Sequence, residues 1–212
     1  MYKKLWETCF SKVFYFYTMK KININNKEYQ KPLLVFAMKE EAVDLFDDYH
    51  LVFTGIGKVN ATYTLTKAIQ QYQPDIIINL GTAGSQTYSK GQVVCCHQFV
   101  QRDMDVSPLG IEKFKTPFSE EEIVLQYGIK LNHLMDGICG SGDSFETEHH
   151  HPEYNIVDME AYALAWVAKQ EGIPFMSLKY ISDGADDAAV GDWKEEVHKA
   201  AKSLAQTLAQ GL

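Results

Sequence analysis

The sequence lacks the features of several protein classes. No apolar run approaches the roughly 20 residues that a membrane-spanning helix needs. Lysine and arginine are outnumbered, with a net charge of −8 over 212 residues, and they form no dense basic stretch. Such a balance argues against binding to a nucleic-acid backbone. We therefore expect neither a membrane nor a nucleic-acid partner, and a small neutral or cationic ligand is easier to accept.

Metal-binding motifs are absent as well. The four cysteines (Cys9, Cys95, Cys96 and Cys139) show neither a CxxC pair nor the spacing of metal ligands. Neighbouring cysteines in a strand point to opposite faces, which favours reduced structural thiols and a cytoplasmic location. The three histidines at 149–151 cannot all reach one ion without distortion, so a solvated loop is the better interpretation. The sequence predicts no bound metal.

Two glycine-based nucleotide motifs also fail. The sequence Gly-Ile-Gly-Lys at 55–58 invites a phosphate-loop interpretation. A Walker loop would need glycine in place of Val52 and serine or threonine in place of Val59. The dinucleotide fingerprint would need glycine in place of Asn60. A tight turn that brings the backbone close to a ligand explains these glycines better.

The length and the 46% hydrophobic content suit one well-buried core. We expect a single domain over residues 32–212 after an N-terminal extension over 1–31, with Met19 as a candidate natural start. Residues 1–18 contain lysines and aromatics, but Glu7 and Lys12 interrupt the apolar run and no cleavage site follows. A secretory signal is therefore rejected.

Hydrophobic patterning predicts strands that alternate with helices. This order is typical of a three-layer α/β sandwich around a central mixed, mostly parallel sheet. The expected strands cover residues 33–37, 51–53, 75–80, 92–100, 136–139 and 175–180, and the expected helices cover 40–46, 59–72, 158–170 and 193–208.

Acidic residues gather where these elements end or begin. Asp158 and Glu160 stand at the start of a predicted helix, and Asp183 follows an apolar strand. Strand carboxyl ends and helix amino ends share one edge of an α/β sheet, so these acids can converge on one pocket. Carboxylates that lie close together can accept hydrogen bonds from sugar hydroxyls, and they can transfer protons at a glycosidic bond. Taken singly, each residue is explained as well by helix capping or surface charge.

Six segments in order, together with these acids, resemble the purine nucleoside phosphorylase superfamily and, within it, the 5′-methylthioadenosine/S-adenosylhomocysteine nucleosidases. The resemblance spans the chain from about residue 33 to its end. It implies the nucleoside phosphorylase-like fold, a homodimer, a nucleoside substrate and hydrolytic release of adenine without metal or organic cofactor. The segments are residues 37–41, 55–59, 74–84, 141–145, 157–161 and 181–183.

The resemblance also implies roles for individual residues. Asp183 is the expected general acid toward the purine N7, and Glu41 is the expected base that activates water. Glu160 would accept hydrogen bonds from the ribose hydroxyls, while Phe145 would stack on the base. Other expected substrate contacts are Ile56, Thr82, Ser144, Glu146 and Met159, and Asp158 and Lys179 are expected to position water or the site.

Departures from the family pattern leave alternatives open. Lys179 stands where these enzymes usually carry arginine, Asp158 replaces a glutamate, and Glu146 replaces an apolar residue. The segments between 41 and 56 and between 145 and 158 are shorter than usual. A phosphorylase of the same fold, a nucleosidase for AMP, adenosine or inosine, and a catalytically silent nucleoside-binding protein are the alternatives. Retention of both an acid and a base favours an enzyme.

Overall fold

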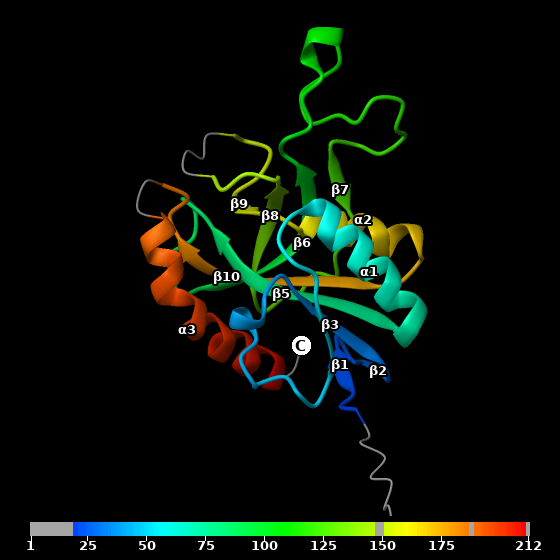
Figure 1. Ribbon diagram of the computed structural model, residues 1–212, viewed down its shortest axis with the longest axis vertical. Helices are drawn as coiled ribbons and strands as arrows, with labels where there is room; N and C mark the ends of the chain where they lie inside the picture. The colour runs from blue at the N-terminus through cyan, green and yellow to red at the C-terminus, as the bar shows by residue number, and fades with distance from the viewer. Residues whose placement is uncertain (1–18, 147–150, 187–188, 211–212) are drawn as a thin grey trace, which may run out of the picture.

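A mixed, eight-stranded sheet forms the centre of the computed structural model, which describes residues 19–146, 151–186 and 189–210 (Figure 1). Its strand order is β10-β6-β8-β9-β5-β3-β4, with β7 paired to β6. β10 also pairs with β5, so the sheet curls back on itself. Most pairings are parallel, as predicted. The strands are β3 (Pro32–Phe36), β4 (His50–Phe53), β5 (Ile76–Gly84), β6 (Val93–Gln101), β7 (Val124–Gln126), β8 (Met135–Ser141), β9 (Ile156–Asp158) and β10 (Phe175–Asp183).

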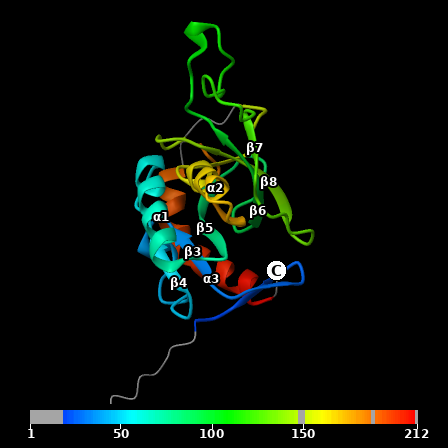
Figure 2. The ribbon, with the colours of Figure 1, turned by 90° about the vertical axis from the view of Figure 1, so that its right-hand side faces the viewer.

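Helices cover both sides of this sheet. α1 (Lys58–Tyr72) and α2 (Ala161–Gln170) pack together on one side, and α3 (Ala189–Ala209) lies against β10 and β5 on the other (Figures 1 and 2). Leu65 and Leu164 belong to one buried cluster, whereas Leu204 belongs to a second. The predicted three-layer sandwich is confirmed. Among the described residues, no helix is both long and apolar enough to cross a bilayer.

The packed fold begins before residue 32, which corrects the boundary placed there from sequence. β1 (Ile22–Ile24) and β2 (Lys27–Tyr29) form an antiparallel hairpin. Ile22, Ile24 and Tyr29 are buried in the same cluster as α3. Alternating apolar positions in so short a segment give a weak signal, and contacts with a distant helix supply the burial. Residues 1–18 lie outside the described residues.

Two predicted helices differ from the structure. The helix expected over 40–46 is reduced to a single 3₁₀ turn, η1 (Lys39–Glu41), because Val43 adopts a left-handed conformation with φ of +49° that ends helical hydrogen bonding. The helix expected from residue 158 starts at Ala161, because the preceding residues form β9. Asp158 therefore ends a strand, and Glu160 is the N-cap residue of α2.

Candidate active site

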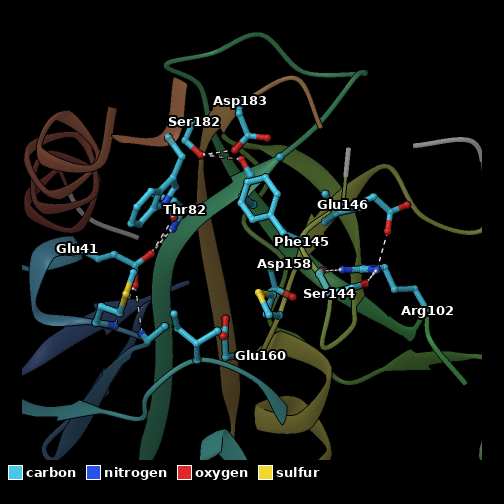
Figure 3. Close-up of a pocket in the computed structure, with 18 residues that line it drawn as sticks. Glu41, Thr82, Arg102, Ser144, Phe145, Glu146, Asp158, Glu160, Ser182 and Asp183 are labelled. Atoms are coloured by element: carbon cyan, nitrogen blue, oxygen red, sulfur yellow. Dashed lines mark hydrogen bonds and ion pairs between the residues drawn. The ribbon is translucent and has the colours of Figure 1, made fainter. Parts of the chain in front are cut away.

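A cavity of about 300 Å³ opens at the carboxyl ends of β5, β9 and β10. The 142–146 loop after β8, the turn before α1, η1 and α3 complete its wall (Figure 3). Every residue that the sequence predicted for the site lines it except Lys179. Those residues are Glu41, Ile56, Thr82, Ser144, Phe145, Glu146, Asp158, Met159, Glu160 and Asp183.

Glu41 is held by backbone and side-chain donors on both carboxylate oxygens. Its side chain is buried, and Oε2 accepts hydrogen bonds from the N–H groups of Ala37 and Met38 at 3.2 Å each. Oε1 accepts from the N–H and the hydroxyl of Thr82, both at 2.8 Å. A Cβ at Gly81 would lie 3.1 Å from Oε1, so glycine gives this carboxylate its room beside β5. The 3₁₀ turn thus fixes Glu41 against the end of the central strand.

Glu160 faces the same cavity from the start of α2. Its Oε1 accepts a hydrogen bond of 2.8 Å from the N–H of Gly57, whose φ of +92° suits glycine. The turn at 55–57 therefore brings its backbone to a carboxylate of the protein, and its close approach to a ligand stays a prediction. Burial and the nearby charge of Asp158 raise the pKa of Glu160 to about 8. This environment favours the protonated form of the carboxyl group.

Lys179 lies behind the cavity wall and acts on the site through Asp158. Its Nζ lies 2.8 Å from Asp158 Oδ2, and both side chains are 2% exposed. The Ser141 hydroxyl and the N–H of Ala161 also donate to Asp158. Burial opposes ionisation, but the Lys179 ammonium outweighs it and lowers the pKa of Asp158 below its usual value. A buried ion pair thus joins Lys179 to the cavity lining, while the positioning role expected of Lys179 and Asp158 stays a prediction.

Asp183 ends β10 and is oriented by its neighbours. The Ser182 hydroxyl donates to Oδ2 at 2.8 Å, and the N–H of Ala185 donates to Oδ1 at 2.9 Å. A Cβ at Gly84 would lie 2.5 Å from Oδ1, so this close approach requires glycine. Burial raises the pKa of Asp183 above its usual value. A carboxyl group in this setting retains its proton to higher pH than an exposed one.

The end of the cavity formed by the loop after β8 is aromatic and charged (Figure 3). Phe145 is 48% exposed, so its ring is open to a ligand. Arg102, which the sequence analysis did not identify, is buried behind it and forms an ion pair with Glu146 at 2.6 Å. A signal existed in the sequence, since Arg102 is its single arginine and follows an apolar strand.

Trp193 of α3 closes the cavity near Thr82. Its Nε1–H donates to the Thr82 hydroxyl at 3.0 Å, so the indole joins the hydrogen bonds that hold Glu41. The sequence analysis did not assign Trp193 to the site. Ser182 and Met38 also line the cavity and were not predicted. Ser182 lies in β10, Met38 precedes η1 and Trp193 belongs to α3, so segments distant in sequence meet at the cavity.

A protein-family comparison places these features in context. Residues 44–212 match the family described as the Phosphorylase superfamily. The chain belongs to this superfamily, which confirms the resemblance. Among its relatives, the 5′-methylthioadenosine/S-adenosylhomocysteine nucleosidase of Geobacillus sp. (strain WCH70) is 30% identical over 179 residues, or 74% of this chain and 77% of that protein. The nucleosidase of Listeria monocytogenes serotype 4a (strain HCC23) is 31% identical over 179 residues, or 73% and 77%.

Solved structures show the same fold. The Helicobacter pylori 5′-methylthioadenosine/S-adenosylhomocysteine nucleosidase has a TM-score of 0.77 at 24% identity, covering 85% of this chain and 96% of that one. The nucleosidase of S. pneumoniae gives a TM-score of 0.73 at 23% identity, covering 84% and 96%. At this identity the likeness establishes the architecture, and the site has to be judged from its own residues.

Proposed function

We propose that the protein is a purine nucleosidase that hydrolyses the N-glycosidic bond of 5′-methylthioadenosine, S-adenosylhomocysteine and similar nucleosides, releasing adenine. The observation that carries this proposal is the convergence of Glu41, Glu160 and Asp183, all buried, on one cavity that also exposes Phe145. Relatives of about 30% identity bear the name of that activity. Carboxylates at a sugar and an aromatic ring at a base form a matching set of contacts.

Departure of the base needs a proton, and Asp183 is the proposed donor. Cleavage of the bond leaves an oxocarbenium-like sugar and places negative charge on the purine, which protonation at N7 neutralises. A carboxylic acid with a raised pKa can hold that proton near neutrality. The Ser182 hydroxyl and the Ala185 N–H fix the orientation of the carboxyl group. They also stabilise the carboxylate that remains after the proton is transferred.

Water is the proposed nucleophile, and Glu41 is the proposed base. A carboxylate has about four acceptor positions, and donors of Ala37, Met38 and Thr82 occupy them in the structure. Rotation of the Thr82 hydroxyl would free one position on Oε1 for a water molecule. The three backbone N–H groups would continue to hold the carboxylate in place while it takes the proton.

Glu160 is the proposed acceptor for the ribose hydroxyls. Burial disfavours the ionised form of Glu160 and raises its pKa to about 8. Hydrogen bonds from two sugar hydroxyls favour the ionised form, and so does the positive charge that develops on the ribose. The carboxylate would therefore stabilise the transition state more than the bound substrate. The Lys179–Asp158 pair keeps a balanced charge beside it.

A hydrolysis screen tests the activity directly. Purified protein is incubated with methylthioadenosine, adenosylhomocysteine, adenosine, AMP and inosine, and the released base is measured by chromatography. Adenine release from the 5′-thio nucleosides, lost in Glu41→Gln, supports the proposal. Turnover confined to AMP, adenosine or inosine assigns a different nucleosidase. Binding without release from any of them favours a silent nucleoside-binding protein.

We also propose a homodimer. Val59 and Tyr63 of α1 and Trp166 of α2 are 78%, 67% and 40% exposed and line one shared hollow. Large apolar side chains gathered on one face are typical of protein–protein contacts. Light scattering after size-exclusion chromatography should give a molar mass of twice the chain mass of 24.1 kDa, and the Tyr63→Glu variant should have the mass of a single chain.

We further propose a cytoplasmic location, which the free, buried thiols of Cys95, Cys96 and Cys139 support.

A further inference from the structure

Arg102 occupies an unusual position for a cation in this protein. It is the single arginine among 20 lysine and arginine residues, and its side chain is 5% exposed. Burying a guanidinium is costly unless acceptors surround it. Arginine differs from lysine in its planar fork of donors, which can hold several acceptors in fixed directions. A buried arginine in a chain that otherwise uses lysine indicates that the fork itself is needed.

In the part of the chain that the structure describes, every acceptor around this fork belongs to the loop over residues 142–146. Nη1 donates to the Ser144 hydroxyl at 3.1 Å and forms the ion pair with Glu146 Oε2 at 2.6 Å. Nη2 donates to the carbonyl groups of Gly142, at 3.3 Å, and Ser144. The four hydrogens on the terminal nitrogens therefore all have loop acceptors. Nε is buried without a partner among the described residues. Because both terminal nitrogens are bound to the loop, Arg102 acts through the loop rather than on a ligand.

The loop is shaped to receive this side chain. A Cβ at Gly142 would lie 2.9 Å from the guanidinium carbon, so the glycine lets the fork approach the backbone. At the start of the loop the Asp143 N–H donates to Asp103 at 2.9 Å. At the end of the loop the Tyr154 hydroxyl donates to the second carboxylate oxygen of Glu146, Oε1, at 3.3 Å. Phe145 lies between these anchors with its ring open to the cavity.

We propose that Arg102, with Glu146 as its charged partner, is the positioning residue for base recognition: it holds the 142–146 loop so that Phe145 and the loop backbone meet the purine. The inference rests on the proposed function, which places the base against this loop. Because the contacts with the base serve binding of substrate and transition state alike, their loss raises KM more than it lowers kcat. A residue needed for folding alone would lower the active fraction and leave KM unchanged.

The test measures base binding separately from turnover. Titration calorimetry with adenine, hypoxanthine and guanine gives the affinity of each base, and steady-state assays give kcat and KM. Arg102→Met should weaken the base that the wild type binds by about tenfold or more, and KM should rise by a similar factor. Arg102→Lys and Glu146→Gln should fall between. Lys169→Met, which breaks the Lys169–Glu121 pair outside the cavity, is the matched control and should leave base affinity unchanged.

A double variant separates loop positioning from the burial of an unpaired charge. In Arg102→Met/Glu146→Leu both charges are gone, so thermal stability should recover relative to Arg102→Met while base affinity stays weak. Recovery of base affinity in the double variant would overturn the proposal, because the fork to the loop carbonyls would then be dispensable. If Arg102→Met does not fold, Arg102→Lys and Glu146→Gln carry the same comparison.

The remaining outcomes also decide. Folded Arg102→Met and Arg102→Lys with wild-type base affinity would overturn the proposal, as would a lower kcat at unchanged KM and affinity. Failure of the wild type to bind any of the three bases would overturn it too. Absence of base release from every nucleoside would refute the proposed hydrolysis and still leave the calorimetric comparison valid, so the two failures are distinguishable.

Discussion

Glu41 and Asp183 reach the cavity from two different elements, and each has its own set of donors. Replacing either carboxylate with its amide keeps the volume and removes the proton transfer. Glu41→Gln and Asp183→Asn should each lower turnover by roughly 10²–10⁴-fold, the range for loss of a general acid or base. Adenine release measures this effect, and thermal unfolding checks that each variant is folded. Near wild-type turnover in a folded variant would show that the proton is handled elsewhere.

Glu160 offers a test that depends on the substrate. Glu160→Gln keeps an acceptor for the Gly57 N–H but weakens the contact with two ribose hydroxyls. The variant should raise KM and lower kcat for a ribonucleoside. A 2′-deoxy substrate has already lost one of these contacts, so the substitution should cost it less. We would measure kcat/KM for both substrates in both proteins; equal losses would contradict the ribose role.

At the scale of elements, the strands that carry the site were predictable and their partners were not. β5 and β10 are rich in apolar residues because both are buried on both faces, and that pattern is visible in sequence although Asn79, Ser177 and Lys179 interrupt it. The strand expected from sequence ended at residue 80, whereas β5 continues to Gly84; Asp183 stands at the end of β10. In the structure the end of β5 and Asp183 line the same cavity, while the catalytic roles of the site residues stay predictions.

The missed features depend on contacts across long sequence distances. Glu41 ends the 3₁₀ turn η1, and its carboxylate accepts a hydrogen bond from Thr82, which is 41 residues away. Arg102 meets its acceptors 40 to 44 residues later, in the loop after β8. The local hydrophobic periodicity of the sequence does not predict such long-range pairs. A lone arginine at a strand end is the one local sign of the second contact.

α3 contributes to the site through Trp193, and this contribution can be isolated. Trp193→Phe keeps a ring at the wall of the cavity and removes the donor to the Thr82 hydroxyl. We expect a loss of several-fold in kcat, because Thr82 helps to hold Glu41. Trp193→Ala removes the ring as well and should lower discrimination between 5′-substituents of different size. Kinetics with methylthioadenosine and adenosylhomocysteine measure both effects. Unchanged ratios in the alanine variant would place the 5′-group away from α3.

For the whole molecule, the buried acids make stability depend on pH. The pKa of Glu160 is about 8 in the folded protein against an ordinary value of 4.5, and that of Asp183 is raised as well. Between these pH values the folded protein keeps a proton that the unfolded chain has released. Stability is therefore expected to fall as pH rises through this window.

Glu160→Gln should flatten that dependence, because glutamine does not titrate. Melting temperatures measured at both ends of the window, for wild type and variant, give the comparison. The net charge of −8 is nearly the same in both proteins, so general repulsion largely cancels in the difference. Parallel curves for the two proteins would show that Glu160 is ionised in the folded state at neutral pH.

The charge of the whole cavity bears on the choice between water and phosphate. Phosphorolysis would hold a dianion beside the sugar, which calls for arginine side chains or a cluster of free backbone N–H groups. In this cavity Glu41, Asp158, Glu160 and Asp183 are acidic, and the N–H groups near Glu41 already donate to it. Lys179 is paired with Asp158, and the terminal nitrogens of Arg102 donate to the 142–146 loop.

Hydrolysis is therefore expected, with a rate that does not depend on phosphate. Two negative charges about 4 Å apart repel by roughly 1 kcal/mol even in water, and by more in a cavity of lower dielectric constant. Incubation with substrate in the presence and absence of phosphate, with identification of the sugar product, tests this expectation. Free ribose product at an unchanged rate agrees with it. Phosphate-dependent turnover that yields a ribose 1-phosphate would contradict it, and would require the Lys179–Asp158 pair to open so that the ammonium could meet the dianion.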